Sequence, residues 1–199
     1  MKNSLRLAGA LDRFSEWTGA FAGWLCLLMV LIGAYNAIVR YLGRSMGWNL
    51  SSNVYIELQW YLFSLVFLLG AAYTLRRGSH VRVDVFYGRL QPRGKAWVNL
   101  LGAVLFLIPF SIFMLWVSWP AVRESWRIRE GSPDPGGLAR YPIKTVILVA
   151  FVLLLIQAVS EIIKQLAIIR GTEDSRIAEA AVAGATVVEA DQDQHGGMA

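Results

Sequence analysis

Four long apolar stretches dominate this chain of 199 residues. They cover about residues 17–39, 54–75, 97–119 and 143–163. Each has roughly the 20 residues that an α-helix needs to cross the hydrocarbon core of a bilayer. Because open strands would leave backbone amides unpaired in lipid, such stretches are read as helices. The sequence therefore predicts an all-α integral membrane protein, with a transmembrane domain of four helices over residues 17–168.

The composition favours the same fold class and limits the meaning of the basic charge. Hydrophobic residues make up 56% of the chain, charged residues make up 17%, and the mean hydropathy is +0.47. A soluble protein with these values would expose an unusually large apolar surface. The net charge of +5 comes mostly from Lys and Arg in connections and flanks. Membrane topology explains these residues, so we predict no nucleic-acid partner.

The distribution of basic residues indicates the orientation of the chain. Twelve Lys and Arg residues lie in the N-terminal segment, the connection between the second and third spans, and the C-terminal flank. Seven lie at the other two connections. Because cytoplasmic loops carry an excess of Lys and Arg, we predict that both termini are cytoplasmic.

The two ends of the chain differ from the spans in composition. Residues 1–16 predict an interfacial amphipathic helix, because Leu7, Leu11 and Phe14 gather on one helical face. The opposite, polar face is predicted to carry Lys2, Arg6, Asp12, Arg13 and Glu16. A simple extension of the first span is the alternative. Residues 171–199 contain few large apolar residues and predict a disordered cytoplasmic tail.

Residue types that support membrane enzyme chemistry are scarce. Haem ligation inside a bundle needs paired histidines within spans, whereas His80 lies in a connection and His195 in the tail. Cys26 is the only cysteine, so thiol exchange and cysteine metal sites have no basis. The chain has no phosphate-binding glycine loop, zinc spacing or nucleophile elbow. We therefore predict no enzyme activity, no cofactor and no metal site.

Glu57 is the most informative acidic residue. A carboxylate in lipid is costly and usually functional, so Glu57 is a candidate proton carrier of a self-contained homodimeric transporter. The alternative is a structural or interface role. Glu57 follows Ser51, Ser52 and Asn53 and falls in the first turn of the second span, where the helix dipole favours an anion.

Several residues within the spans predict helix packing. The first span carries a stripe of small residues within about 80° on the helix surface, which allows close helix approach in this subunit or to a partner. Pro109 removes a backbone donor in the third span and predicts a kink there. The stripe consists of Gly19, Gly23, Cys26, Gly33 and Ala37. Two pairs of polar residues each share a helix face, Asn36 with Arg40 and Gln157 with Glu161, and we expect them to form hydrogen bonds to other helices, with substrate binding as the alternative.

Two connections carry distinctive composition. Residues 130–138 hold two prolines and three glycines, which predict a shaped turn on the outer side, either a connector or a partner contact. Residues 75–90 are rich in arginine and predict a short interfacial helix or turn. Anchoring to lipid headgroups would account for these arginines.

The segment 70–84, with sequence GAAYTLRRGSHVRVD, resembles a known family when it is read together with Glu57 and Trp60. It is similar to the small membrane subunit, of DctQ type, of tripartite ATP-independent periplasmic (TRAP) transporters. The third connection adds to this resemblance, with Pro135-Gly136-Gly137-Leu138 followed by Pro142-Ile143-Lys144. The resemblance covers roughly residues 10–168.

The resemblance implies a transporter of three parts in the bacterial inner membrane. A periplasmic solute-binding protein captures an organic acid, a large multispan membrane subunit moves it with a sodium gradient, and the small subunit braces the large one. This chain would then hold no substrate or ion site. The third connection looks most like the branch associated with 2-oxo acids. The residues implied to contact partners or seat the protein in lipid are Glu57, Trp60, Arg77, His80, Arg82, Asp84, Pro135, Gly136 and Gly137.

Overall fold

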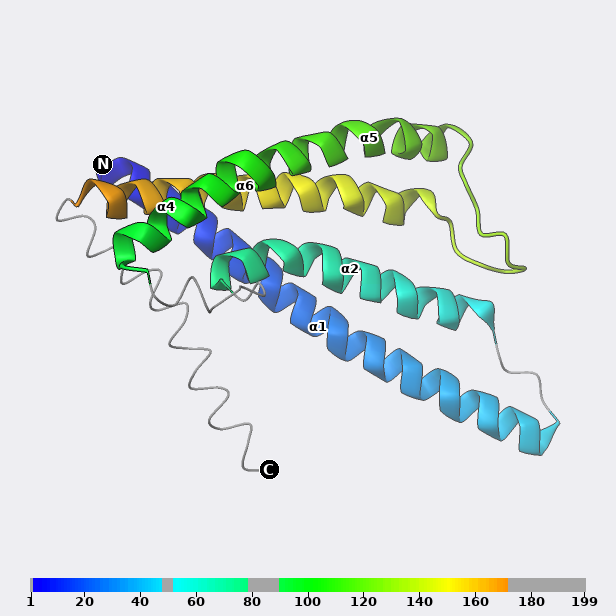
Figure 1. Ribbon diagram of the computed structural model, residues 1–199. Helices are drawn as coiled ribbons and strands as arrows, with labels where there is room; N and C mark the ends of the chain where they lie inside the picture. Colours follow the sequence, from blue (N-terminus) through cyan, green and yellow to red (C-terminus); the bar gives the residue numbers. More distant parts are fainter. Residues whose placement is uncertain (1, 48–51, 79–89, 172–199) are drawn as a thin grey trace, which may run out of the picture. The chain divides into compact units, whose positions relative to one another are not determined.

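The computed structural model describes residues 2–47, 52–78 and 90–171, and every regular element in these ranges is a helix. The expected all-α fold is confirmed for this part of the chain. His80, Arg82, Asp84 and the predicted tail lie outside the described residues. The elements are α1 (Lys2–Met46), α2 (Asn53–Arg77), α4 (Pro92–Gly102), the π-helical turn η1 (Ala103–Leu107), α5 (Ile108–Arg127) and α6 (Tyr141–Arg170) (Figure 1).

Four helices are long and apolar enough to cross a membrane. They cover Leu5–Arg44, Asn53–Arg77, Arg93–Arg127 and Tyr141–Arg170. Each contains one of the predicted spans and continues into its polar flanks, since backbone hydrogen bonding persists beyond the apolar core. The four-span prediction is therefore confirmed, whereas the cytoplasmic placement of the termini remains a prediction.

Residues 2–16 are helical, and they continue without a break into the first span within the 45 residues of α1. Asp12, which the sequence placed on a water-facing side, is instead buried, with 8% of its surface exposed. That assignment was wrong because Lys164 and two polar neighbours on α6 surround its carboxylate. An interfacial position of this segment in the membrane stays a prediction.

The described chain forms two compact units. The first unit contains residues 2–16, 72–78, 90–113 and 152–171, and the second contains residues 17–47, 52–71 and 114–151. The core of the first unit is formed by Ala96 of α4 with Ala167 and Ile168 of α6. Leu5 of α1 packs against this core, and Figure 1 shows the three helical segments beside each other. Small residues at the centre allow these helices to approach closely.

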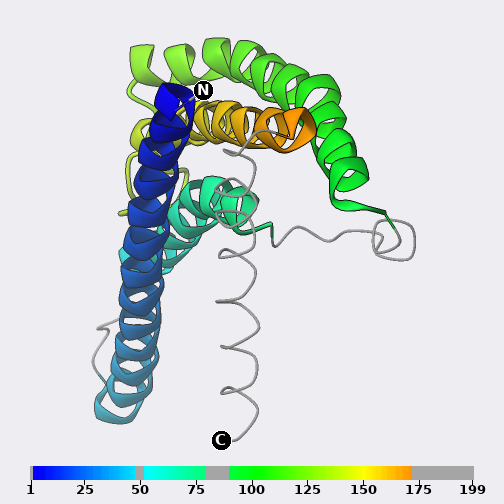
Figure 2. The same cartoon turned by 90° about the vertical axis from the view of Figure 1, so that its left-hand side faces the viewer.

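A π-helical turn interrupts the third span next to Pro109. The backbone N–H of Ile108 bonds the carbonyl of Ala103, five residues back, where an α-helix would reach back four. Pro109 follows and has no N–H to donate to Leu105. The structure thus has an irregular turn next to Pro109, where the sequence predicted a kink, and Figure 2 shows that the green part of the third span is curved.

The second unit exposes many large apolar side chains. Trp24 is 71% exposed, Phe67 is 68% exposed and Trp116 is 74% exposed. A soluble protein does not leave such residues in water over whole helices, whereas lipid or another transmembrane helix covers them readily. These faces are thus suited to the interior of a membrane.

Candidate partner-contact site

Glu57 is the centre of a polar cluster in the second unit. It lies in the second turn of α2 and is only 2% exposed. One carboxylate oxygen accepts a hydrogen bond from the hydroxyl of Ser132, and the other accepts one from the backbone N–H of Leu138. Glu57 therefore fastens α2 to the connection between α5 and α6, which agrees with the structural alternative for this residue.

Two further side chains of α2 hold the same connection. Asn53 Nδ2 donates to the carbonyl of Pro135 at 3.2 Å, and the Tyr61 hydroxyl donates to the carbonyl of Ala139 at 3.0 Å. Asn53, Glu57 and Tyr61 are spaced four residues apart and so project from one face of the helix. A single face of α2 therefore determines the path of residues 132–139, which we call the outer loop.

The glycines of the outer loop meet specific backbone requirements. Gly136 has a φ of +74°, a conformation that side chains disfavour. A Cβ atom added at Gly137 would clash with Ser132 Cβ and would lie 2.6 Å from Glu57 Oε1, so a larger residue would force this part of the loop to shift. The sequence predicted a shaped turn here, and these two residues now show why it requires glycine.

A second acid secures the base of the outer loop. Glu130 accepts hydrogen bonds from Lys144 Nζ and from Ser125 Oγ, the latter at 2.6 Å. These two donors, the lysine first, hold the pKa of the Glu130 carboxyl below its ordinary value of 4.5. The carbonyl of Glu130 also accepts a 2.8 Å hydrogen bond from the N–H of Arg140. The loop is thus closed at its base.

The remaining proposed contact residues have varied surroundings. The guanidinium of Arg140 lies 5.9 Å from the ring centroid of Trp60, which is 39% exposed. Arg77, in the first unit, lies over the ring of Tyr73 at 5.2 Å. Pro135 and Gly136 are exposed at the tip of the outer loop, whereas Gly137 is half-buried. The tip is therefore available to a partner while its sides are held by α2.

The small-residue stripe of α1 contacts α2 at Gly33, whereas it faces open space at Gly23. A Cβ added at Gly33 would lie 3.3 Å from Gln59 Oε1 of α2, so this glycine serves packing within the subunit. A Cβ added at Gly23 would meet no atom within 4 Å, and Cys26 is exposed. Gly19 is half-buried. The stripe around Gly23 thus leaves room for a helix outside the described residues of this chain.

The first unit contains a buried polar cluster, of which the sequence predicted only the interhelical hydrogen bonding of Gln157. Asp12 Oδ1 accepts hydrogen bonds from Ser160 at 2.7 Å and Gln157 at 3.0 Å, and Lys164 Nζ lies 3.2 Å from Asp12 Oδ2. Arg76 of α2 adds an ion pair to the neighbouring Glu16. Gln157, Ser160 and Lys164 form a polar stripe at helical spacing on an otherwise apolar helix, and this signal would have revealed the cluster.

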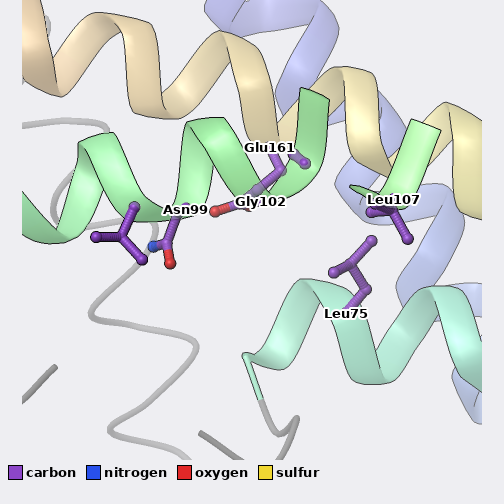
Figure 3. Close-up of a pocket in the computed structure, with 7 residues that line it drawn as sticks. Leu75, Asn99, Gly102, Leu107 and Glu161 are labelled. Atoms are coloured by element: carbon purple, nitrogen blue, oxygen red, sulfur yellow. The ribbon is translucent and has the colours of Figure 1, made fainter. Parts of the chain in front are cut away.

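A cavity of about 250 Å³ lies beside the π turn in the first unit. Leu75 of α2 and Leu107 of η1 line it, together with Asn99 and Gly102 of α4 and Glu161 of α6 (Figure 3). Glu161 forms a 3.0 Å ion pair with Lys164. Its carboxylate is therefore already engaged within the chain.

These features define a class of protein: a helical integral membrane protein whose acidic groups fasten its own helices and loops. The family model described as tripartite ATP-independent periplasmic transporters, DctQ component, matches residues 29–168. Because this match covers more than half of the chain, the chain belongs to that family, and it is the small membrane subunit of a TRAP transporter. A comparison with curated proteins and one with solved structures found no match to this chain. Subunits of this family work with a large membrane subunit and a periplasmic binding protein.

Proposed function

We propose that this subunit braces the large membrane subunit in the bacterial inner membrane during uptake of an organic acid. A sodium gradient drives the uptake, and the periplasmic solute-binding protein delivers the substrate. The likeness of the outer loop to one branch of the family favours 2-oxo acids as the substrate class. Membership of the DctQ family supports the transport role.

The engagement of the acidic groups carries this proposal. Glu57 accepts from Ser132 and Leu138, Asp12 pairs with Lys164, and Glu161 pairs with the same lysine. A carboxylate that carries an ion must lose and regain its partners in each transport cycle. The carboxylates of Glu57 and Asp12 are instead bonded to groups from distant parts of the chain, and that of Glu161 is paired within α6. A brace needs such fixed contacts, whereas an autonomous carrier does not benefit from them.

The apolar outer faces supply the surface that a brace requires. Large side chains along α1 and α5 are exposed over several turns, among them Trp24, Leu31 and Trp116. Between membrane helices, close packing of such faces stabilises association. Gly23, with open space around it, gives α1 a position where a foreign helix can approach closely. We propose that the large subunit packs on this face of α1.

The outer loop is the proposed contact for the periplasmic binding protein. Its exposed tip holds Pro133, Asp134, Pro135 and Gly136. Hydrogen bonds from Asn53 and Tyr61, together with Glu57 as acceptor, hold the sides of the loop in place. A contact surface that is already ordered loses less conformational entropy on binding. The loop can therefore take part in a transient encounter without first refolding.

The proposal is tested by sodium-driven uptake in proteoliposomes that contain the large subunit and its binding protein. Uptake is measured with this chain, without it, and with the variants Glu57→Gln and Glu124→Gln. We expect uptake to require the chain and to be unchanged in Glu124→Gln. In Glu57→Gln we expect uptake to persist at a reduced level, because this substitution weakens the hydrogen bonds that hold the outer loop. Glu124 is a suitable control because it is an exposed acid on the same chain. Full uptake without the chain would contradict the bracing role.

The same assay separates the brace from an autonomous proton carrier. Proteoliposomes that contain only this chain are given a proton gradient and a labelled organic acid. We expect no uptake above that of empty liposomes. Proton-driven uptake that disappears in Glu57→Gln would establish the carrier instead and would contradict the accessory role.

A further inference from the structure

A polar groove lies in the second unit, near the end of α1. Its volume is about 450 Å³, and it is lined by Gln59 of α2 and by six residues of α1, namely Gly33, Asn36, Ala37, Arg40, Tyr41 and Arg44. The groove is therefore large enough to receive the polar part of a lipid.

The charge of this groove is positive and unbalanced. Arg40 and Arg44 are four residues apart, so their guanidinium groups lie on one face of α1. Neither forms an ion pair with another residue in the described ranges, and the lining contains no Asp or Glu. Two neighbouring cations repel each other, and an anion placed between them relieves that repulsion. The groove thus favours an anionic ligand.

The groove also has incomplete hydrogen bonding. Asn36 Oδ1 is buried and has no hydrogen-bond partner among the described residues. Buried polar atoms in folded proteins nearly always have a partner, so this acceptor calls for a donor, such as a water molecule or a hydroxyl group of a ligand. The amide groups of Asn36 and Gln59 also offer N–H donors to ester oxygens.

The position of the groove along α1 identifies the source of the anion. Arg40 and Arg44 follow directly after the apolar stretch 17–39, where a spanning helix reaches the level of the lipid headgroups. Tyr41, which also lines the groove, is 80% exposed, as expected for an aromatic residue at the level of the headgroups. At this depth the most abundant anion is the phosphate of a phospholipid.

We propose that this groove binds one anionic phospholipid. The guanidinium groups of Arg40 and Arg44 hold its phosphate oxygens, and the amides of Asn36 and Gln59 hold its ester oxygens. Guanidinium suits this role because its planar donors bind phosphate in pairs. The inference goes beyond the bracing function and does not depend on it.

The test is lipid titration of the full-length chain in mild detergent, with bound lipid counted by native mass spectrometry. Phosphatidylglycerol is the probe, phosphatidylcholine is the zwitterionic comparison, and inorganic phosphate is added as a competitor. The test variant is Arg40→Gln with Arg44→Gln. The matched control is Arg6→Gln with Arg13→Gln. Both arginines are exposed on the same helix, and their substitution removes the same amount of charge. Arg40→Lys with Arg44→Lys keeps the charge and removes the planar donors.

We expect one phosphatidylglycerol to bind more tightly than phosphatidylcholine, and its affinity to fall by about tenfold in the glutamine test variant. The lysine variant should bind with intermediate affinity, and the Arg6 and Arg13 control should bind like the parent chain. Equal losses in both glutamine variants would mean generic charge attraction and would overturn the site. Displacement of the lipid by equimolar inorganic phosphate would overturn the choice of lipid.

A protein partner on the same arginines is distinguished in the assembled complex. If Arg40 and Arg44 contact an acidic surface of the large subunit, the glutamine test variant loses co-purification of that subunit while it keeps phosphatidylglycerol affinity. This result would overturn the lipid site. If the glutamine test variant still co-purifies with the large subunit but loses its affinity for phosphatidylglycerol, the lipid site is confirmed.

Discussion

Replacing Asp12 by Asn tests the buried pair that joins the start of α1 to α6. Lys164 is buried, with 5% of its side chain exposed, and lies 3.2 Å from Asp12. Asn keeps the size of the side chain and an acceptor for Ser160 and Gln157, but it leaves Lys164 without this countercharge. Loss of one member of a buried ion pair costs about 3–5 kcal/mol. Because Glu161 still lies 3.0 Å from Lys164, we expect the lower end, about 3 kcal/mol.

The assay is reversible unfolding of the full chain in mixed detergent, followed by fluorescence of its eight tryptophans. The free energy of unfolding is measured for Asp12→Asn, for Lys164→Met and for the double variant. The double variant should be more stable than the sum of the two losses predicts, because it removes both charges together. The exposed pair Glu124 and Arg127 supplies the control, and Glu124→Gln should change stability little.

Two results would refute this reasoning about Asp12. A loss below about 0.5 kcal/mol in Asp12→Asn would show that the carboxylate does not compensate Lys164. Strict additivity in the double variant would show that the two residues do not interact. Either result would also remove the argument that this acid fastens the chain.

Two further predictions concern the outer loop and its base. Gly137→Ala should lower the melting temperature and increase amide hydrogen exchange over 132–139, because its Cβ would approach Glu57 Oε1 to 2.6 Å, whereas Gly131→Ala should not, because its Cβ meets nothing within 4 Å. Equal exchange in the two variants would contradict this account. For Glu130, the lowered pKa means that its bonds to Lys144 and Ser125 stabilise the loop fully above pH 4.5 and are lost as the pH falls below that value. Exchange over the same residues should therefore rise at acidic pH in the parent chain, and an unchanged pH dependence in Glu130→Gln would refute the assignment.

The spans could be predicted from the sequence because hydropathy over about 20 residues is a local property. Pro109 likewise predicted an interruption of the third span, since a missing N–H acts within one helix. The π form of this interruption was not predictable, because it depends on how the neighbouring carbonyls find other donors. Local signals thus determined which elements form and where one of them is irregular.

The polar clusters depended on contacts between distant residues. Glu57 was recognised as structural or functional from its place at a helix start, but its partners Ser132 and Leu138 lie far along the chain. Asp12 was assigned to a water-facing side because its own helix showed a polar face there. Its burial follows from Ser160 and Lys164 on α6, and no local pattern around Asp12 could reveal them.

Co-purification from gently solubilised native membranes tests the central claim most directly. The tagged chain is isolated, and the proteins that accompany it are identified and quantified by mass spectrometry. The bracing account predicts a large multispan membrane subunit in equal amount. Recovery of this chain alone, as a homodimer, would contradict that account.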